Sequence, residues 1–417
     1  MDKRTILVWF RNDLRIHDNE ILLRAIERGQ QIVPVYCFDP RHFELTEYGT
    51  RKMGVLRAAF LRENVLALQG ALRNLGGDLI SVVGYPEEML PHIAEEYQVD
   101  EVYHHREVAF EETQVSASVE AALWKKTQIN LRHFIGHTLY HKEDLPFPIR
   151  DIPDAFSLFK KKTERESTIR PQLGLPERVS TPENMETSDV PSLQQLGFSP
   201  GEIRQASNLA LTGGEQEALH RMDSFLNGYT PQATDSGLSP YIAIGALSPN
   251  TLYHAVKDSR YIGTDKKYLE QFILKLLWRD YFRFMFKKHG NRFFQTGGIT
   301  GLAPETAGQE EILNFDKWKA GNTGQPVIDR GIRQLNETGH IPHQMRVLLA
   351  TYLIHELGVS WLKGAAWFEE KLIDYNPANN YGNWAHLAGV GSSVKDNKRI
   401  DLDKLITQLS PAETLAI

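Results

Sequence analysis

Residues 361–391 read WLKGAAWFEEKLIDYNPANNYGNWAHLAGVG, and the rest of the chain is organised around this stretch. It combines three indoles, a carboxylate and a cluster of amides: Trp361, Trp367, Asp374, Asn376, Asn379, Asn380, Asn383 and Trp384. A buried amide without a hydrogen-bond partner costs about 1–3 kcal/mol. The composition therefore predicts a polar, planar guest, and a heteroaromatic cofactor fits. An Asn- and Gly-rich loop between two helices fits the same stretch equally well.

Length and composition limit the kind of protein this is. With 417 residues, 41% of them apolar, the chain suits two or three domains. The single cysteine, Cys37, allows no internal disulfide, and a reducing cytoplasm is the default expectation. The charged start precedes no apolar run long enough for a signal peptide or a membrane span. A net charge of -6 argues against charge-driven coating of DNA but allows a local basic patch.

The first part of the chain alternates β-rich runs with amphipathic helical patterns. Strands are expected at residues 5–10, 31–38, 78–83, 101–105 and 129–134, and helices at residues 56–75 and 87–97. This alternation predicts a doubly wound α/β domain with a parallel sheet over residues 1–135. RNDLRIHDN, not GxGxxG, follows the first strand, so a typical dinucleotide site is not expected there. Cys37 is expected in the core.

Two further regions follow. Residues 136–213 are rich in Pro, Ser and Glu, as an inter-domain connector would be. Residues 214–417 predict an all-helical domain, with helices at residues 215–226, 251–257, 269–288, 327–335, 345–357 and 361–372. This domain contains five of the seven tryptophans, so the aromatic residues concentrate where the polar guest is expected.

Three stretches of the helical half are candidates for converging on one ligand. In TDSGLSPYIAIGALSP (234–249), a helix that begins near Ser239 offers free N–H groups to a phosphate, although an ordinary capped helix is the simpler explanation. In residues 275–294, Trp278 and Arg279 belong to an aromatic and a basic helical stripe that can stack a base and hold a phosphate. Snorkelling arginines on an amphipathic helix explain that pattern equally well.

The third stretch, residues 323–358, contains His343 and Arg346, one helical turn apart. Arg346 is the candidate partner of Asp374 in a buried ion pair. Fifteen histidines are scattered without an HExxH motif or a Cys/His spacing, so no metal site is expected.

Taken together, these stretches resemble the photolyase and cryptochrome family, most closely its DASH-type cryptochromes. The resemblance covers nearly the whole chain and rests on motifs in the family's order: VWFRNDLRIHDN at 8–19, GHTLYHKEDLPF at 136–147, IRPQL at 169–173, SGLSPYIAIGALSP at 236–249, LLWRDYFRF at 276–284, WKAGNTGQPVID at 318–329 and DYNPANNYGNW at 374–384. The resemblance implies an α/β domain followed by an all-α FAD-binding domain.

The resemblance also assigns site residues. The expected FAD contacts are Ser236, Gly237, Leu238, Ser239, Arg279, Arg346, Asp374, Asn376 and Asn380. Among them, Asn380 would face the flavin N5, where a neutral polar partner favours reduced flavin. Trp384 and Trp361 match the inner and middle members of a tryptophan chain that carries electrons to the flavin. The outermost position is Gly308 here, so Trp318 or a tyrosine is expected at the surface end.

The family's reaction is light-driven electron transfer from reduced flavin to a pyrimidine dimer flipped out of DNA. The expected substrate contacts are Trp278, Lys275, His343 and His386. Cyclobutane-dimer repairers place Glu, Asn and Met where this chain has Lys275, His343 and Val347. His343 also falls where (6-4) photolyases carry a catalytic histidine.

Three functions remain open at this point. The first is a photolyase that splits pyrimidine dimers, with cyclobutane dimers as the first expectation and (6-4) products as the alternative lesion. The resemblance to DASH-type proteins implies a preference for single-stranded DNA. The second is a blue-light-sensing cryptochrome without repair activity. The third, disfavoured by Trp361, Trp384 and Asn380, is a light-independent flavoprotein. A folate is the family's usual antenna pigment, and Glu111 and Glu112 are candidate contacts for it in this chain. We expect a cytoplasmic monomer that acts on UV-damaged DNA and binds no membrane.

Overall fold

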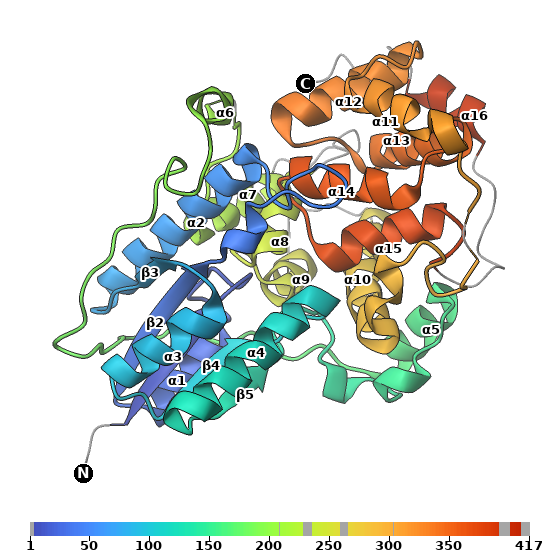
Figure 1. Ribbon diagram of the computed structural model, residues 1–417. Coiled ribbons are helices and arrows are strands. Elements are labelled where there is room, and N and C mark those ends of the chain that lie inside the picture. The colour runs from blue at the N-terminus through green and yellow to red at the C-terminus, as the bar shows by residue number, and fades with distance from the viewer. Residues whose placement is uncertain are drawn as a thin grey trace.

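A parallel sheet and a group of helices form the two halves of the molecule (Figure 1). The computed structural model describes residues 4–207, 209–227, 236–258, 266–302, 304–391 and 401–409, without the side chains of residues 266–269. In Figure 1 the sheet lies at the left, in blue to teal, and the helices of the second half run from the centre to the right, in yellow-green to red.

The sheet has five parallel strands in the order β3-β2-β1-β4-β5. The strands are β1 Thr5–Phe10, β2 Gln31–Phe38, β3 Ile80–Val83, β4 Glu101–His105 and β5 Leu131–Phe134. All five were predicted from the sequence, and β3 and β5 each begin two residues later than predicted. Before β3, the Asp78 carboxylate accepts the Leu79 N–H at 2.7 Å, so a side-chain contact replaces a ladder bond there.

Helices cover both faces of this sheet. They are α1 Glu20–Arg28, α2 Val55–Asn74, α3 Pro86–Glu96 and α4 Phe110–Thr127, with a short turn η1 Pro40–His42. Alternate residues of β1 belong to two separate cores: Ile6 packs with α1 and α2, and Leu7 packs with α3 and α4. This two-sided burial confirms the predicted doubly wound fold. Cys37 is buried in β2, where burial raises the pKa of its thiol.

The segment after β5 carries η2 Lys142–Asp144, η3 Ile149–Asp151, α5 Phe156–Glu166 and α6 Pro200–Ala206. Between α5 and α6 it forms no helix or strand and runs back along the sheet domain, where the Ile32 N–H donates to the Ser180 carbonyl at 2.7 Å. The sequence pattern did not predict α5. This helix contacts α10 of the helical half, so part of the expected connector is a packed element.

The second half is helical throughout its described residues. Its elements are α7 Glu215–Asn227, α8 Ser239–Ile244, α9 Pro249–Asp258, α10 Lys266–His289, η4 Gly290–Phe294, η5 Gly308–Glu310, α11 Glu311–Lys319, α12 Pro326–Thr338, α13 His343–His355, α14 Trp361–Lys371, α15 Pro377–Leu387 and α16 Leu402–Gln408. The all-helical prediction is confirmed. The alternative of an Asn- and Gly-rich loop is wrong, because α15 occupies that stretch. No helix in the described ranges is long and apolar enough to cross a membrane.

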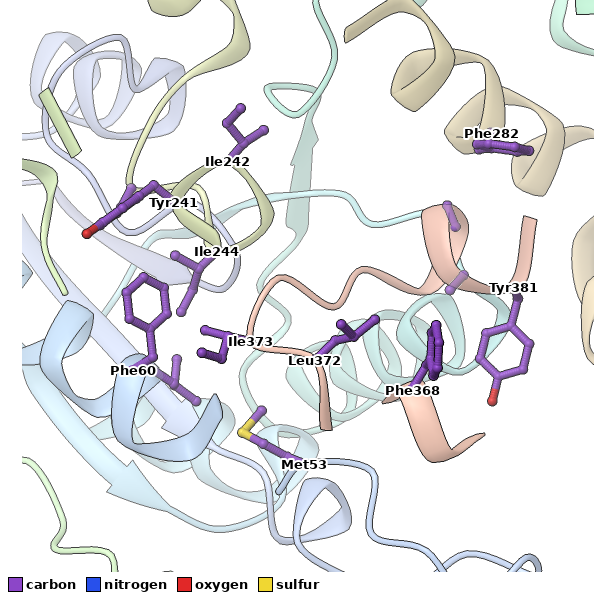
Figure 2. Close-up of a cluster of buried hydrophobic side chains, with 14 of the residues drawn as sticks. Met53, Phe60, Tyr241, Ile242, Ile244, Phe282, Phe368, Leu372, Ile373 and Tyr381 are labelled. Carbon is purple, nitrogen blue, oxygen red and sulfur yellow. The ribbon is translucent and has the colours of Figure 1, made fainter. Parts of the chain in front are cut away.

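One hydrophobic core joins the two halves. Met53 and Phe60 of the first half lie beside Ile244 and Ile373 of the second (Figure 2), and all four belong to the same buried cluster. Burial of apolar area at about 25 cal/mol per Å² stabilises this junction. The relative position of sheet and helices is therefore part of the folded core.

Gly245, directly after α8, lies where the backbones of the two halves approach each other closely. Its φ is +74°, and a Cβ there would lie 1.9 Å from the Asn12 carbonyl oxygen. Gly290 has a similar φ of +61° but no atom within 4 Å of such a Cβ. We expect Gly290→Ala to lower the free energy of unfolding by about 1–2 kcal/mol, from backbone strain alone.

Gly245→Ala should lower the free energy of unfolding by about 1–3 kcal/mol more than Gly290→Ala does, because a clash with the main chain of Asn12 adds to the same backbone strain. Thermal unfolding of the two variants measures the difference. Equal melting temperatures would show that the halves do not pack this closely.

Candidate functional site

A cavity opens among α13, the turn between α14 and α15, and α15 itself. It encloses about 480 Å³, part of it open to solvent. Its lining residues are His343, Arg346, Val347, Ala350, Phe368, Leu372, Asp374, Tyr375, Asn376, Asn379, Asn380, Asn383, Trp384 and Leu387. Six of the site residues predicted from the sequence lie here: His343, Arg346, Asp374, Asn376, Asn380 and Trp384. The stretch on which the sequence analysis opened supplies most of this wall.

The amides build one face of α15. Asn376 caps the helix by accepting the Asn379 N–H at 3.3 Å, and Pro377 stands at the first turn. Asn380 donates through Nδ2 to the Ala365 carbonyl of α14 at 2.9 Å. The Asn383 Nδ2 donates to the Asn379 carbonyl at 2.7 Å, while the Asn379 Oδ1 is buried without a partner. The amides thus tie two helices together and leave an acceptor at the cavity wall.

Asp374 connects three parts of the chain at the cavity. Its Oδ2 accepts a hydrogen bond from Arg346 at 2.9 Å and one from the Ser239 hydroxyl at 2.6 Å. The predicted Arg346–Asp374 ion pair is confirmed. The Asp374 Oδ1 is buried without a partner. A carboxylate with one oxygen saturated and the other unpaired is suited to accept a hydrogen bond from a bound molecule.

Two opposing effects set the protonation of Asp374. Burial alone would raise its pKa, but the Arg346 charge and the hydrogen bonds from Arg346 and Ser239 hold the pKa below its ordinary value. Asp374 is therefore ionised at neutral pH. The cavity wall carries a fixed carboxylate beside a guanidinium.

The loop before α8 reaches this site through Ser239. Ser236 accepts the Leu238 N–H at 3.3 Å, and Gly237 has a left-handed φ of +63°. Leu238 is buried in the core. Ser236, Gly237, Leu238 and Ser239 do not line the cavity described above, and their link to it is the Ser239–Asp374 bond.

Close packing places the indoles. A Cβ on Gly364 would lie 2.3 Å from the Trp384 ring, so the absence of a side chain at Gly364 lets Trp384 lie against α14. Trp361 begins that helix one turn earlier and donates its Nε1–H to the Thr296 carbonyl at 3.0 Å. Trp384 also contacts Trp318, with ring centroids 6.4 Å apart. Trp384 lines the cavity and Trp361 does not.

Arg279 and Arg283 of α10 are buried rather than arranged as an exposed stripe. Arg279 donates to the carbonyls of His137 and Ile242, and does not line the cavity. Burial and the Arg283 charge lower the pKa of Arg279 to about 10, and it stays protonated at neutral pH. Its observed partners are backbone carbonyls of the connector and α8. The alternative explanation, snorkelling arginines, is wrong, because the side chains of both arginines are buried.

Trp278 has an aromatic partner that the sequence pattern did not predict. Its indole stacks on Phe156 of α5, with centroids 3.6 Å apart and an interplanar angle of 13°. The Phe282 ring lies 5.5 Å away on the same helix face, as the spacing predicted. Phe156 covers one indole face, and Trp278 remains partly exposed.

Of two polar residues expected to contact the substrate, His343 lines the cavity and Lys275 does not. Lys275 is exposed on α10, and His343 begins α13. Although His343 reaches solvent, desolvation of its ring and the charges of Arg346 and Lys275 lower its pKa. The histidine is therefore neutral near pH 7. His386, near the end of α15, is half-buried and does not line the cavity.

The apolar part of the wall was not predicted. Phe368, Leu372, Ala350 and Leu387 complete the lining. Helical spacing offers a signal in hindsight, because Ala350 lies three residues after Val347 and Leu387 three after Trp384. Within the described ranges, no group of three His, Cys, Asp or Glu side chains is arranged to hold a metal ion.

Asp374→Asn tests the ion pair. Loss of a hydrogen bond between charged groups should lower the stability of the protein by about 1.5–3 kcal/mol at neutral pH. Because the folded pKa is depressed, this contribution is present above pH 4 and lost as the pH falls through the folded value. The difference in melting temperature from the unmodified protein should stay constant above pH 4 and shrink as the pH is lowered below that value.

The exposed Asp144–Arg170 pair provides the matched control, since its shortest contact is 2.6 Å but both side chains reach solvent. Asp144→Asn should cost under about 1 kcal/mol. If Asp374→Asn costs no more than Asp144→Asn, the buried pair does not stabilise the site.

Comparison with known proteins agrees with this geometry. Residues 6–182 match the family model of DNA photolyase, and residues 272–405 match the FAD binding domain of DNA photolyase. The Gloeobacter violaceus protein named Cryptochrome DASH is 37% identical over 426 residues, covering 99% of this chain and 84% of that protein. The Arabidopsis thaliana protein named Cryptochrome DASH, chloroplastic/mitochondrial, is 33% identical and is covered over 74% of its length by 98% of this chain.

Solved structures give the same result. A Synechocystis cryptochrome superposes with a TM-score of 0.89 at 36% identity, over 99% of this chain and 87% of that one. A bacterial class III photolyase from Agrobacterium tumefaciens superposes with a TM-score of 0.83 at 25% identity, over 98% and 85%. The two-part fold, the matched FAD-binding domain and the full-length similarity lead to one conclusion: the chain belongs to the photolyase and cryptochrome family, among proteins of the DASH type.

Proposed function

We propose that this protein binds FAD in the cavity of the helical half and uses light to split pyrimidine dimers in DNA. The observation that carries the proposal is the cavity wall, in which Asp374, Asn379 and Trp384 meet. The buried, unpaired oxygens of Asp374 and Asn379 call for hydrogen-bond donors from a guest.

Each wall residue has a defined task in this proposal. When bound, reduced flavin supplies a light-absorbing one-electron donor. The Arg346–Asp374 pair orients the polar edge of the ring system, and Asn380 is assigned to its N5 by the family resemblance. Ser239, bonded to Asp374, connects the expected phosphate loop of residues 236–239 to the same wall. The phosphate role of Arg279 remains a prediction, because its donors here go to backbone carbonyls.

Trp384 and Trp361 are assigned to electron supply. Trp384 lines the cavity, and its approach to Gly364 brings it close to the helix that begins at Trp361. Trp318, in contact with Trp384, offers a second route from the same residue.

The substrate assignment depends on the outer side of the cavity. A flipped pyrimidine dimer costs only a few kcal/mol to extrude, since it is already poorly stacked. Trp278 can stack on a base with the indole face that Phe156 leaves uncovered. Lys275, neutral His343 and His386 would contact the lesion or its phosphates. We assign cyclobutane dimers first, in single-stranded DNA, and (6-4) products as the alternative.

A blue-light sensor without repair activity is the second candidate. Phe156 occupies one stacking face of Trp278, and Lys275 stands where dimer repairers carry an acid. Both features reduce the space and proton support for a lesion while leaving the flavin and its tryptophans intact. This reading predicts flavin photoreduction without dimer splitting.

Further assignments rest on the family resemblance. A folate antenna would involve Glu111 and Glu112; here Glu111 pairs with Lys52, and burial and the Glu107 charge raise the pKa of Glu112 to about 8. We also propose a cytoplasmic monomer.

The site residues are tested by photoreduction of bound flavin under blue light with an external thiol. Trp384→Phe should slow photoreduction at least tenfold, because phenylalanine is far harder to oxidise, and Asn380→Ala should change the spectrum of the photoreduced state. Trp124→Phe, on an exposed indole of α4, is the control and should leave both unchanged. Rates in Trp384→Phe that match those of Trp124→Phe would reject the electron route.

The function is tested by a repair assay. The reduced, FAD-loaded protein is illuminated with oligonucleotides carrying a cyclobutane dimer or a (6-4) product, each single- and double-stranded. We expect restored thymine absorbance with the single-stranded cyclobutane substrate. Clean flavin photoreduction without repair of any substrate would instead establish the sensor. Failure to bind FAD at all would overturn both.

A further inference from the structure

A second cavity lies where the sheet domain meets α10, away from the residues that line the first. It encloses about 330 Å³, part of it open to solvent. Its lining residues are Arg106, Val108, Ile135, His137, Thr138, Lys142, Arg283, Phe284 and Lys287. None of the lining residues is acidic, and none is shared with the first cavity.

The fold gives this cavity a position that ligands commonly occupy. Arg106 and Val108 directly follow β4, and Ile135 and His137 directly follow β5. The carboxyl ends of parallel strands meet at one edge, and open α/β sheets bind ligands in crevices at that edge. Here α10 closes the crevice from the opposite side.

Four cationic side chains line this space: Arg106, Lys142, Arg283 and Lys287. Across the part of the chain that the structure describes, the side chains of Arg106, Lys142 and Lys287 form no ion pair or hydrogen bond. Arg283 donates one guanidinium N–H to the buried Glu107 at 2.8 Å. Its Nε is buried without a partner, and the side chain is only 3% exposed. A buried donor left unpaired costs free energy, so the orphaned Nε points to an absent acceptor.

The cations also act on each other. Burial, followed by the charges of Lys142, Arg106 and Arg283, lowers the pKa of Lys287 to about 8. Every charge that shifts Lys287 is positive, so no carboxylate balances this lysine. Glu107 offsets one of the four charges through Arg283. The group therefore keeps a local positive excess in a protein whose net charge is -6.

The remaining walls are apolar. Val108, Ile135 and Phe284 line the same space as the cations. Phe284 is buried and offers an aromatic ring. A bare inorganic anion would use only the charged side. An anion attached to a flat ring would use both.

We propose that this cavity binds a nucleotide through its phosphate, with the phosphate held by Lys142, Lys287 and the Arg283 Nε and the base placed against Ile135 and Phe284. Glu107 balances Arg283 only, so the other three cations lack a counter-charge among the described residues, and a phosphate supplies several acceptor oxygens for these cations and for the unpaired Arg283 Nε. The phosphate can come from a free mononucleotide or from the end of a DNA strand, since both present the same group. This site does not depend on FAD or on dimer repair.

The test is calorimetric titration of the full, FAD-loaded chain, so that the first cavity is filled. The probes are AMP, adenosine, inorganic phosphate and a short oligonucleotide with or without a 5′-phosphate. We expect AMP to bind more tightly than adenosine or inorganic phosphate. Lys142→Gln/Lys287→Gln should weaken AMP binding roughly tenfold for each charge removed.

Lys125→Gln is the matched control. Lys125 is exposed in the last turn of α4, which leads into the opposite, amino-terminal end of β5. This variant removes one positive charge without touching the cavity and should bind AMP as the unmodified protein does. If only the 5′-phosphorylated oligonucleotide binds, and if this binding is lost in the double variant, then a strand end is the source of the phosphate.

The melting temperature of the double variant distinguishes the proposal from a purely structural role for Lys142 and Lys287, in which their loss would destabilise the protein. If the cations are held for a ligand, the ligand-free double variant should melt at the same or a higher temperature, because mutual repulsion is relieved. Equal affinities for AMP and adenosine, unchanged AMP affinity in the double variant, or a melting temperature lowered by loss of the lysines would each overturn the proposal.

Discussion

The structure depends on a buried carboxylate that holds the loop after the first strand. Glu215, at the start of α7, accepts the backbone N–H groups of Ile16 and His17, each at 2.9 Å. In the same loop, the Arg15 guanidinium donates to the Gly245 carbonyl at 2.9 Å. Burial raises the pKa of Glu215, while the two backbone donors oppose that rise. A polar loop survives between two apolar cores only because its groups are hydrogen-bonded in this way.

This junction positions the first cavity. Gly245 ends α8 against the backbone of Asn12, so α8 is fixed to the sheet domain. At the other end of α8, Ser239 is bonded to Asp374. A second connection joins the Gly54 N–H to the Glu370 carbonyl at 2.9 Å, just before the turn that carries Asp374. The sheet domain thus fixes the cavity wall from two sides. The geometry of the polar wall therefore does not depend only on the turn between α14 and α15.

Local patterns explain which features could be predicted. The β-rich runs were short and bounded by polar residues, so all five strands were found, and the Arg346–Asp374 pair followed from two charges expected in a core. Contacts between distant residues left no local pattern. The burial of Arg279 depends on a carbonyl of His137, and the stacking of Trp278 depends on Phe156, each more than a hundred positions away. For α15, the capping Asn376 and Pro377 were a helix start signal hidden within an amide-rich composition.

Electrostatics also distinguish among the tryptophans of the helical half. Removing an electron from an indole leaves a positive charge, which a nearby ammonium group opposes. Trp367 has Lys371 at 4.4 Å and Lys319 at 5.6 Å from its ring. In the described residues, no lysine or arginine stacks on the Trp384 or Trp361 ring. On the proposed electron route, a positive charge that begins on Trp384 would therefore be opposed more strongly by nearby lysines on Trp367 than on Trp361, although both belong to α14. On that proposed route, the placement of the lysines, and not the number of indoles, favours Trp361 over Trp367 as the next electron donor.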